Sequence, residues 1–166
     1  AGPFEDQPVT PPAVWLPHAE VAVTPTQPTV IPAGPYQGHM LVGDLTLATV
    51  NRVVLEKVGG EYQGCVLAFA GGFESGVSRL EWTPDGSLLV GGFSAPGWGR
   101  EGRQAFGLQK LRLNGKSAFE MFAVRAKSNG MEIEFTQPLA PGVGWDTALY
   151  EASQWRYEPK ADFGGG

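Results

Sequence analysis

Residues 38–92 read GHMLVGDLTLATVNRVVLEKVGGEYQGCVLAFAGGFESGVSRLEWTPDGSLLVGG. Short apolar runs in this stretch are separated by glycine-rich turns, a pattern typical of successive antiparallel strands. The last pair of runs flanks Pro84-Asp85-Gly86, where proline presets φ, aspartate can bond the backbone ahead of it and glycine accepts a positive φ. Four short strands with such a turn between the last pair are typical of one blade of a β-propeller.

The composition favours an all-β chain. The 166 residues include 24 glycines and 14 prolines, and charged residues make up only 17% of the total. Such a loop-rich sequence argues against helical bundles and coiled coils. The net charge of −5 comes without any basic run, so nothing predicts nucleic acid as a partner. No apolar stretch approaches membrane-spanning length, and we therefore expect no membrane span.

Disulfides and metal sites find no support in the sequence. Cys65 is the only cysteine, which excludes an internal disulfide and a cysteine-based metal cluster. Because it lies in an apolar run, we expect its thiol to be buried. The acidic residues are scattered and no Asp-x-Asp-x-Asp-Gly loop occurs, so we expect no metal site.

The sequence divides into three parts. Residues 1–37 are rich in proline and predict an extended segment laid across a folded surface, with at most one or two short strands at sheet edges. A disordered linker is the alternative. Residues 38–116 predict propeller blades, and they close with a strand in which Leu111 and Leu113 alternate with basic neighbours. Residues 117–166 predict the start of a β-sandwich.

The third part carries a hairpin signal. Residues 119–126 and 131–135 read as strands, and Asn129-Gly130 between them predicts a tight turn because both positions tolerate positive φ. Residues 149–157 read as a further strand. These strands are fewer than a sandwich usually needs. The predicted fold class is therefore all-β, with a partial propeller followed by an incomplete sandwich, and we expect further blades, another chain or a second copy to cover the open faces.

Several motifs occur together along the chain: Pro12-Ala13-Val14-Trp15-Leu16-Pro17-His18, Thr24-Pro25-Thr26-Gln27-Pro28, Gly34-Pro35-Tyr36-Gln37-Gly38-His39-Met40-Leu41-Val42-Gly43-Asp44, Glu61-Tyr62-Gln63-Gly64, Trp82-Thr83-Pro84-Asp85-Gly86, Phe106-Gly107-Leu108-Gln109, Phe119-Glu120-Met121 and Ala126-Lys127-Ser128-Asn129-Gly130. Together they resemble the glucose/sorbosone dehydrogenase-like β-propellers of bacteria, over nearly the whole chain. The closest group in that family is large secreted proteins often joined to c-type haem domains. In that group the last blades lead into an immunoglobulin-like sandwich.

The resemblance implies a six-bladed propeller that binds pyrroloquinoline quinone (PQQ), oxidises the anomeric carbon of sugars and passes electrons to a c-type haem domain. It also implies a secreted or periplasmic location. The family's three cofactor-binding cations align with Thr46, Gly76 and Ser78, and an acidic residue of its motif aligns with Arg79. PQQ carries three carboxylates, and their burial without Arg or Lys partners costs several kcal/mol each. We therefore expect no cofactor, and PQQ belongs only to the alternative in which the chain is part of a dehydrogenase.

The same alignment identifies three candidates for residues that line the central funnel of the propeller. Asp44, Thr46 and Arg79 fall near the cofactor-facing end of the blade. Because the family's cations are missing there, one hypothesis is that Asp44 and Arg79 form an ion pair that fills the emptied site. The alternative is that they are unrelated polar residues at strand ends.

Two histidines and one loop complete the candidates. His18 lies in a proline-rich turn and is the candidate catalytic base, because histidine titrates near neutral pH; a loop-packing role is the alternative. His39 opens a strand and is predicted to be exposed. In a glycine-dense loop, Trp98, Arg100 and Arg103 are candidates for contact with a sugar ring or a protein partner, unless the tryptophan folds back on its blade.

Two functions follow from these observations. The first is a non-catalytic propeller-plus-sandwich protein that binds glycans or proteins or takes part in assembly. The alternative is part of a PQQ-dependent sugar dehydrogenase that passes electrons to a haem domain. The missing cations favour the first function and the overall resemblance favours the second, so the sequence leaves enzymatic activity open.

Overall fold

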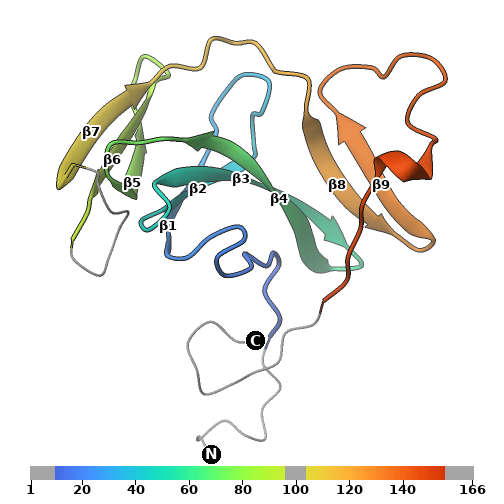
Figure 1. The fold of residues 1–166 in the computed structure, drawn as a ribbon. Helices are drawn as coiled ribbons and strands as arrows, with labels where there is room; N and C mark the ends of the chain where they lie inside the picture. Colours follow the sequence, from blue (N-terminus) through green and yellow to red (C-terminus); the bar gives the residue numbers. More distant parts are fainter. Residues whose placement is uncertain (1–9, 96–103, 156–166) are drawn as a thin grey trace, which may run out of the picture.

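The computed structural model describes residues 10–95 and 104–155, whose regular structure is almost all β (Figure 1). One short 3-10 helix, η1 (Thr147–Leu149), is also present. Among the described residues, no helix is long and apolar enough to span a bilayer. The strands are β1 (Pro25–Val30), β2 (Met40–Asp44), β3 (Thr49–Val58), β4 (Glu61–Gly71), β5 (Gly76–Trp82), β6 (Leu88–Phe93), β7 (Phe106–Leu111), β8 (Met121–Lys127) and β9 (Gly130–Phe135).

The first sheet is an antiparallel meander with the strand order β1-β2-β3-β4. Its edge strand β1 contains Pro25 and Pro28, and the pairing with β2 shifts register between these two prolines. Proline lacks the amide N–H of a ladder bond, so it is tolerated at a sheet edge or beside a bulge. The sheet therefore uses the proline-rich segment at its edge, as the sequence predicts.

The second sheet has three strands in the order β5-β6-β7. The predicted Pro84-Asp85-Gly86 turn joins β5 to β6. The Gly86 amide donates to the Thr83 carbonyl at 2.9 Å, and Asp85 Oδ1 accepts from the Ser87 amide at 3.1 Å. Gly86 has a φ of +76°, which only glycine adopts at little cost. The turn chemistry read from the sequence is confirmed.

Residues 38–92 do not form one blade-like unit, and that prediction is wrong. Their strands β2, β3 and β4 lie in the first sheet, where β1 supplies the fourth strand, whereas β5 and β6 lie in the second sheet. The break falls between Gly71, which ends β4, and Gly76, which begins β5. The sequence hides this boundary because β1 is proline-rich and reads as irregular extended chain.

The third sheet is the β8–β9 hairpin. Lys127 pairs with Gly130 across the two-residue turn Ser128-Asn129, so the predicted hairpin is confirmed. The predicted turn chemistry is not, because Gly130 already begins β9 and the φ of Asn129 is not positive. On β9, Ile133 and Phe135 are half-buried while the glutamates between and before them are exposed. The alternation predicted from the sequence is therefore present.

The further strand predicted at 149–157 is wrong for its described part. Helix η1 ends at Leu149, and residues 150–155 form no strand. The Asp146 side chain caps this turn by accepting from the Ala148 amide at 3.0 Å. Such a local bond between side chain and backbone competes with sheet pairing.

The two larger sheets share one apolar core. Strand β5 packs against β1 and β2, and Thr26 Oγ1 of β1 donates to the Val77 carbonyl of β5 at 3.1 Å. Burial of each large aliphatic side chain stabilises the fold by about 1.5–3 kcal/mol relative to exposure. The buried members of the core are Ile31, Tyr36, Leu41, Ala48, Val50, Phe73, Val77, Leu80, Leu88 and Val90.

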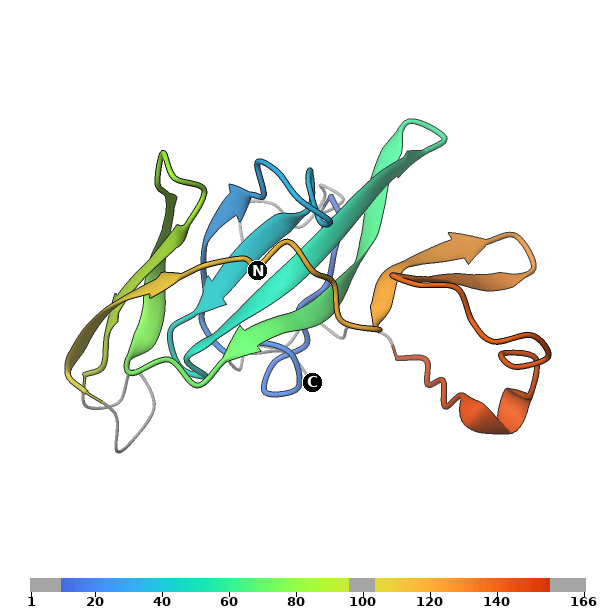
Figure 2. The same cartoon turned by 90° about the horizontal axis from the view of Figure 1, so that it is seen from above.

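Two irregular segments cover the first sheet on opposite sides. Residues 11–24 run beneath it in Figure 1, and residues 112–120 cross above it from β7 to β8, as Figure 2 also shows. The lower segment is tied to β3, because Asn51 Nδ2 donates to the Val21 carbonyl at 3.0 Å. Ala22 is buried against the sheet. This is the extended, surface-laid segment that the proline-rich sequence predicts.

Gly76 shows how closely β5 approaches its neighbours. A Cβ built at Gly76 would lie 1.9 Å from the Leu45 carbonyl oxygen and 2.8 Å from the Phe93 carbonyl oxygen. Real Cβ atoms do not approach backbone oxygens so closely, so no side chain fits at this position without moving the backbone. The start of β5 therefore depends on glycine.

We expect Gly76→Ala to lower the free energy of unfolding by about 2 kcal/mol or more, because overpacking against backbone cannot be relieved by a rotamer change. Gly91→Ala in β6 is the matched control, since its Cβ would meet only Leu108 Cδ1 at an ordinary 3.7 Å. Urea unfolding of the two variants measures the difference. Equal stability of the two variants would contradict the packing described at Gly76.

Candidate functional site

Asp44 is a buried structural carboxylate at the end of β2. Its side chain accepts from the amides of Val23 at 2.7 Å, Thr24 at 2.8 Å and Leu47 at 2.6 Å, and its residue has no exposed surface. Two of these bonds hold the N-terminal segment and the third closes the turn after β2. A buried carboxylate needs such donors to offset its lost hydration. The carboxylate of Asp44 therefore has a structural role, because it accepts hydrogen bonds from three backbone amides.

Asp44, Thr46 and Arg79 do not line one open site: Thr46 joins the internal network of Asp44, and Arg79 lies apart from it. Thr46 Oγ1 lies 2.9 Å from Thr24 Oγ1, so its hydroxyl belongs to the same internal network. Arg79 is exposed on β5 and donates to the Ser78 carbonyl at 3.0 Å. Among the described side chains, no ion pair joins Asp44 to Arg79, and the ion-pair hypothesis is wrong. Backbone amides already satisfy Asp44, while Arg79 keeps its hydration at the surface.

His18 lies in a tight loop of the N-terminal segment. The Ala19 amide donates to the Ala22 carbonyl at 2.9 Å, and the Val21 amide donates to the Pro17 carbonyl at 3.0 Å. These bonds describe a locally closed loop, and the role of His18 as a catalytic base stays a prediction. Three predicted contact residues lie outside the described residues, so their role also stays a prediction: Trp98, Arg100 and Arg103.

The three positions that the resemblance aligns with cofactor-binding cations carry no charge in this chain, and the expectation of no cofactor stays a prediction. The Thr46 hydroxyl is bonded to Thr24, Gly76 has no room for a side chain, and Ser78 is neutral. Only Arg79 carries a positive charge in this set, and it replaces an acid rather than one of the cations.

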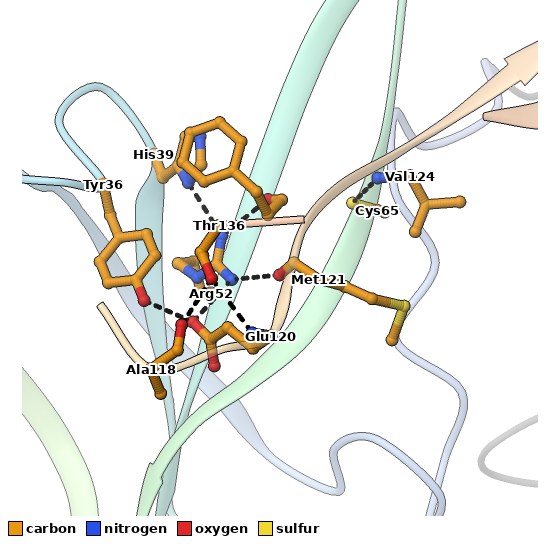
Figure 3. Close-up of polar contacts among 10 residues, drawn as sticks. Tyr36, His39, Arg52, Cys65, Ala118, Glu120, Met121, Val124 and Thr136 are labelled. Atoms are coloured by element: carbon orange, nitrogen blue, oxygen red, sulfur yellow. Dashed lines mark hydrogen bonds and ion pairs between the residues drawn. The ribbon is translucent and has the colours of Figure 1, made fainter. Parts of the chain in front are cut away.

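Arg52, in the middle of β3, forms a buried polar cluster that the sequence did not reveal. Its residue has 0% exposure. Nη1 donates to the Phe122 carbonyl at 2.9 Å and lies 3.0 Å from His39 Nδ1, while Nη2 donates to the Met121 carbonyl at 2.9 Å and to Glu120 Oε1 at 3.3 Å (Figure 3). Nε is the one guanidinium nitrogen without a partner.

Aromatic rings complete the surroundings of the guanidinium. Arg52 Cζ lies 4.5 Å from the centroid of the Tyr36 ring and 6.0 Å from that of Phe122. A desolvated cation over an aromatic face contributes about 2 kcal/mol. Tyr36 Oη donates to Glu120 Oε1 at 2.6 Å (Figure 3). The same carboxylate oxygen therefore accepts from both the phenol and the guanidinium.

The cluster fixes the protonation of two of its members. Burial raises the pKa of Tyr36 to about 12, and the hydrogen bond to Glu120 acts in the same direction, so the phenol stays a donor. Burial lowers the pKa of His39, and the Arg52 charge acts in the same direction. A neutral imidazole can accept from Arg52 through Nδ1. His39 is half-buried with its ring 4.6 Å from that of Phe122, and the prediction that it is exposed is wrong.

The Arg52 cluster acts as a clamp. It joins the turn before β2 and the middle of β3 to the start of β8, and Phe122 of β8 lies 70 residues beyond Arg52 along the chain. Arg52 is fully buried while the Glu120 side chain is 34% exposed, so loss of the partners would leave the guanidinium charge buried and uncompensated. Nearly every polar group of the cluster is used by another member. This geometry suits holding sheets together rather than binding a substrate.

An open apolar surface lies on the side of the second sheet that faces away from the core. Pairing places Phe93 opposite Phe106 and Gly91 opposite Leu108, so their side chains share one face. Phe106 is 80% exposed, Leu108 73% and Phe93 38%. We call these three side chains the β6–β7 face. Large exposed apolar groups in one patch mark an interaction surface more often than single ones do.

A second apolar surface belongs to the third sheet. A groove of about 800 Å³ lies between β9 and residues 139–152. Ile133 and Phe135 of β9 form one wall, and Trp145 and Tyr150 contribute to the other. On the other strand of the hairpin, the Val124 amide of β8 donates to the sulfur of the half-buried Cys65 of β4 at 3.3 Å (Figure 3). The hairpin is thus attached along one edge and open over its apolar face.

No protein-family model matches the chain, and comparisons with curated proteins and with solved structures also give no match. In the part of the chain that the structure describes, no group of three or more His, Cys, Asp or Glu side chains is arranged to hold a metal ion. The class that residues 10–95 and 104–155 define is an all-β fold with three small antiparallel sheets.

The His39 environment predicts a pH dependence of stability. In the unfolded chain, His39 binds a proton as the pH falls below 6.5. In the folded chain it binds that proton only at a lower pH, because its pKa is lowered. The stability contributed by neutral His39 is therefore fully present above pH 6.5 and is lost as the pH falls through the folded pKa. We expect His39→Asn, whose Oδ1 can accept from Arg52 without titrating, to flatten this part of the profile.

Urea unfolding at a series of pH values below 7 measures this effect as the difference between wild type and His39→Asn. Acidic groups that titrate at lower pH contribute to both proteins and cancel in the difference. A difference that stays constant across the series would show that His39 does not titrate in contact with Arg52.

Proposed function

We propose that this chain belongs to a β-propeller of the glucose/sorbosone dehydrogenase-like type that acts in protein binding and assembly rather than in catalysis. In this proposal β1–β4 and β5–β7 belong to neighbouring blades, and the β8–β9 hairpin begins an immunoglobulin-like sandwich. The partner is a further antiparallel β-sheet that packs on the β6–β7 face, and the protein works in the secreted or periplasmic space. The single observation that carries the proposal is the exposed β6–β7 face.

The arrangement of the two larger sheets supports the blade assignment. Each is an antiparallel meander, and their first strands, β1 and β5, lie at the contact between them. Radially repeated sheets of a propeller also pack one against the next through apolar faces. Gly43 of β2 allows the close approach, because a Cβ there would lie 2.5 Å from Val77 Cγ1 of β5.

The two sides of the second sheet support the choice of partner. Leu80, Leu88 and Val90 on its inner side are buried in the core shared with the first sheet. Phe106 and Leu108 on its outer side are solvent-exposed, and β7 is the edge strand of the sheet. A further sheet on this side would cover the apolar face as the first sheet covers the opposite one. It would also protect an edge that is otherwise free to pair with other chains.

The interior chemistry favours binding over catalysis. Asp44, which the alignment places at the funnel, is occupied by backbone amides. Gly76, which aligns with a cofactor-binding arginine, cannot accommodate a side chain. The alternative is a PQQ-dependent dehydrogenase with a c-type haem partner, and its support is the sequence resemblance.

We expect no cofactor absorption band when the protein is mixed with PQQ and Ca²⁺, because the aligned positions lack the cations that would pair with the quinone carboxylates. Absorption spectra before and after removal of free PQQ measure this, with a known PQQ-binding sugar dehydrogenase as the positive control. A saturable band that is retained, together with sugar-dependent bleaching, would establish the dehydrogenase alternative.

For the binding surface, we expect the purified protein to self-associate with rising concentration, because a second copy offers the β6–β7 face a sheet to pack against. The Phe106→Asp/Leu108→Asp double variant should remain monomeric, since burial of a charge in an apolar interface is costly. Sedimentation velocity over a range of concentrations measures both. Because these side chains are exposed, the free energy of unfolding should change by less than about 1 kcal/mol.

The matched control for this experiment is Val58→Asp/Tyr62→Asp at the far end of the β3–β4 pair. These residues have similar exposure, 51% and 59%, but lie in the other sheet. The control should associate like wild type. A wild-type protein that is monomeric at every concentration, or a control that loses association equally, would contradict the assignment of the β6–β7 face.

A further inference from the structure

A small pocket lies where the segment after β7 passes the turn before β2. Its volume is about 140 Å³, and it is lined by residues 35–36 on one side and residues 112–116 on the other. Leu111 and Leu113 pack against the apolar core, so the alternation of side chains turns Arg112 outward. Lys116 is exposed at the other end of the same short segment.

The cations of this pocket differ from all the others that the structure describes. Eight lysines and arginines lie in residues 10–95 and 104–155, and the side chains of six have a hydrogen-bond, ion-pair or aromatic partner. The remaining two, Arg112 and Lys116, both line the pocket. The six partnered residues are Arg52, Lys57, Arg79, Lys110, Arg125 and Lys127.

The pocket also lacks a competing negative charge among its lining residues. The carboxylate that contacts Tyr36 belongs to Glu120, and it is held by the Tyr36 phenol and by Arg52. The floor of the pocket is fixed in shape, because Asn114 Oδ1 accepts from the Lys116 amide at 2.9 Å and Gly115 takes a φ of +72°. In a chain of net charge −5, two unpaired cations on one preformed pocket make a local positive site.

We propose that this pocket binds a small oxyanion, a carboxylate, phosphate or sulfate group, between Arg112 and Lys116. A guanidinium offers two parallel N–H donors to such a group, and an ammonium adds a point charge. The volume of about 140 Å³ is well below the roughly 300–1,000 Å³ of sites that enclose whole small molecules. The site therefore holds the charged group of a ligand and leaves the remainder outside.

Isothermal titration calorimetry of the purified protein with inorganic phosphate tests the proposal, at constant ionic strength set with chloride. We expect saturable binding that weakens at least tenfold in Arg112→Gln/Lys116→Gln. The matched control Lys57→Gln/Lys127→Gln removes the same two charges elsewhere and should leave the affinity within twofold. Both variant pairs change exposed side chains, and thermal unfolding checks that each variant is folded.

A second arm distinguishes the sources of the oxyanion. Glucuronate presents a carboxylate on a sugar, whereas glucose has the same ring without the charge. Competition of glucuronate with phosphate, absent for glucose, assigns the site to acidic glycans as well as to free anions; phosphate binding without that competition restricts the site to free or ester phosphate. Equal, weak heats in wild type, variant and control would show an adventitious ion only and overturn the proposal, as would the absence of phosphate binding.

Discussion

The hydrogen bonds from the Arg52 guanidinium to the carbonyls of Met121 and Phe122 are the interaction on which the placement of the third sheet against the first depends. The segment 112–120 between β7 and β8 has no regular structure, so backbone pairing cannot position the third sheet. A buried cation can do so because leaving it unpaired is far costlier than pairing it. Its donors reach two consecutive carbonyls, at 2.9 Å each, and thereby fix both the position and the direction of the chain as β8 begins.

The other contacts between the first and third sheets contribute less free energy than the bonds of Arg52. Arg125 of β8 lies 3.7 Å from Glu56 of β3, while its shorter pair, with Glu134 of β9 at 2.7 Å, stays within the third sheet. Burial opposes, but does not outweigh, the carboxylates that raise the pKa of Arg125. Partly exposed ion pairs of this type contribute at most about 1 kcal/mol. The hairpin edge adds the contact between Cys65 and the Val124 amide. Arg52 therefore carries the larger share of the specificity.

The sequence predicted those features that depend on local backbone chemistry. The Pro84-Asp85-Gly86 turn was readable because its glycine accepts the positive φ that the turn requires. The β8–β9 hairpin was also found in the right place, although its turn residues are Ser128 and Asn129 rather than Asn129 and Gly130. The sheet to which a strand belongs was not readable, since β1 pairs across a loop and carries prolines. The clamp was missed for a similar reason, because its members come from three distant segments. One signal was present, the single charged residue at Arg52 within an apolar run, since a buried arginine requires partners.

The clamp also affects how well the exposed cations of residues 112–120 can bind a ligand, because it fixes one end of that segment. Residues 112–120 are held at one end by Leu113 in the apolar core and at the other by Glu120, which accepts from Tyr36 and Arg52. A loop fixed at both ends loses little conformational entropy when a ligand binds to it. Lys116 lies between these two anchors and Arg112 directly precedes the first of them, so the entropy cost of ordering their backbone is met during folding. The buried cation thus makes a surface pair of cations more effective than two lysines or arginines on a free loop would be.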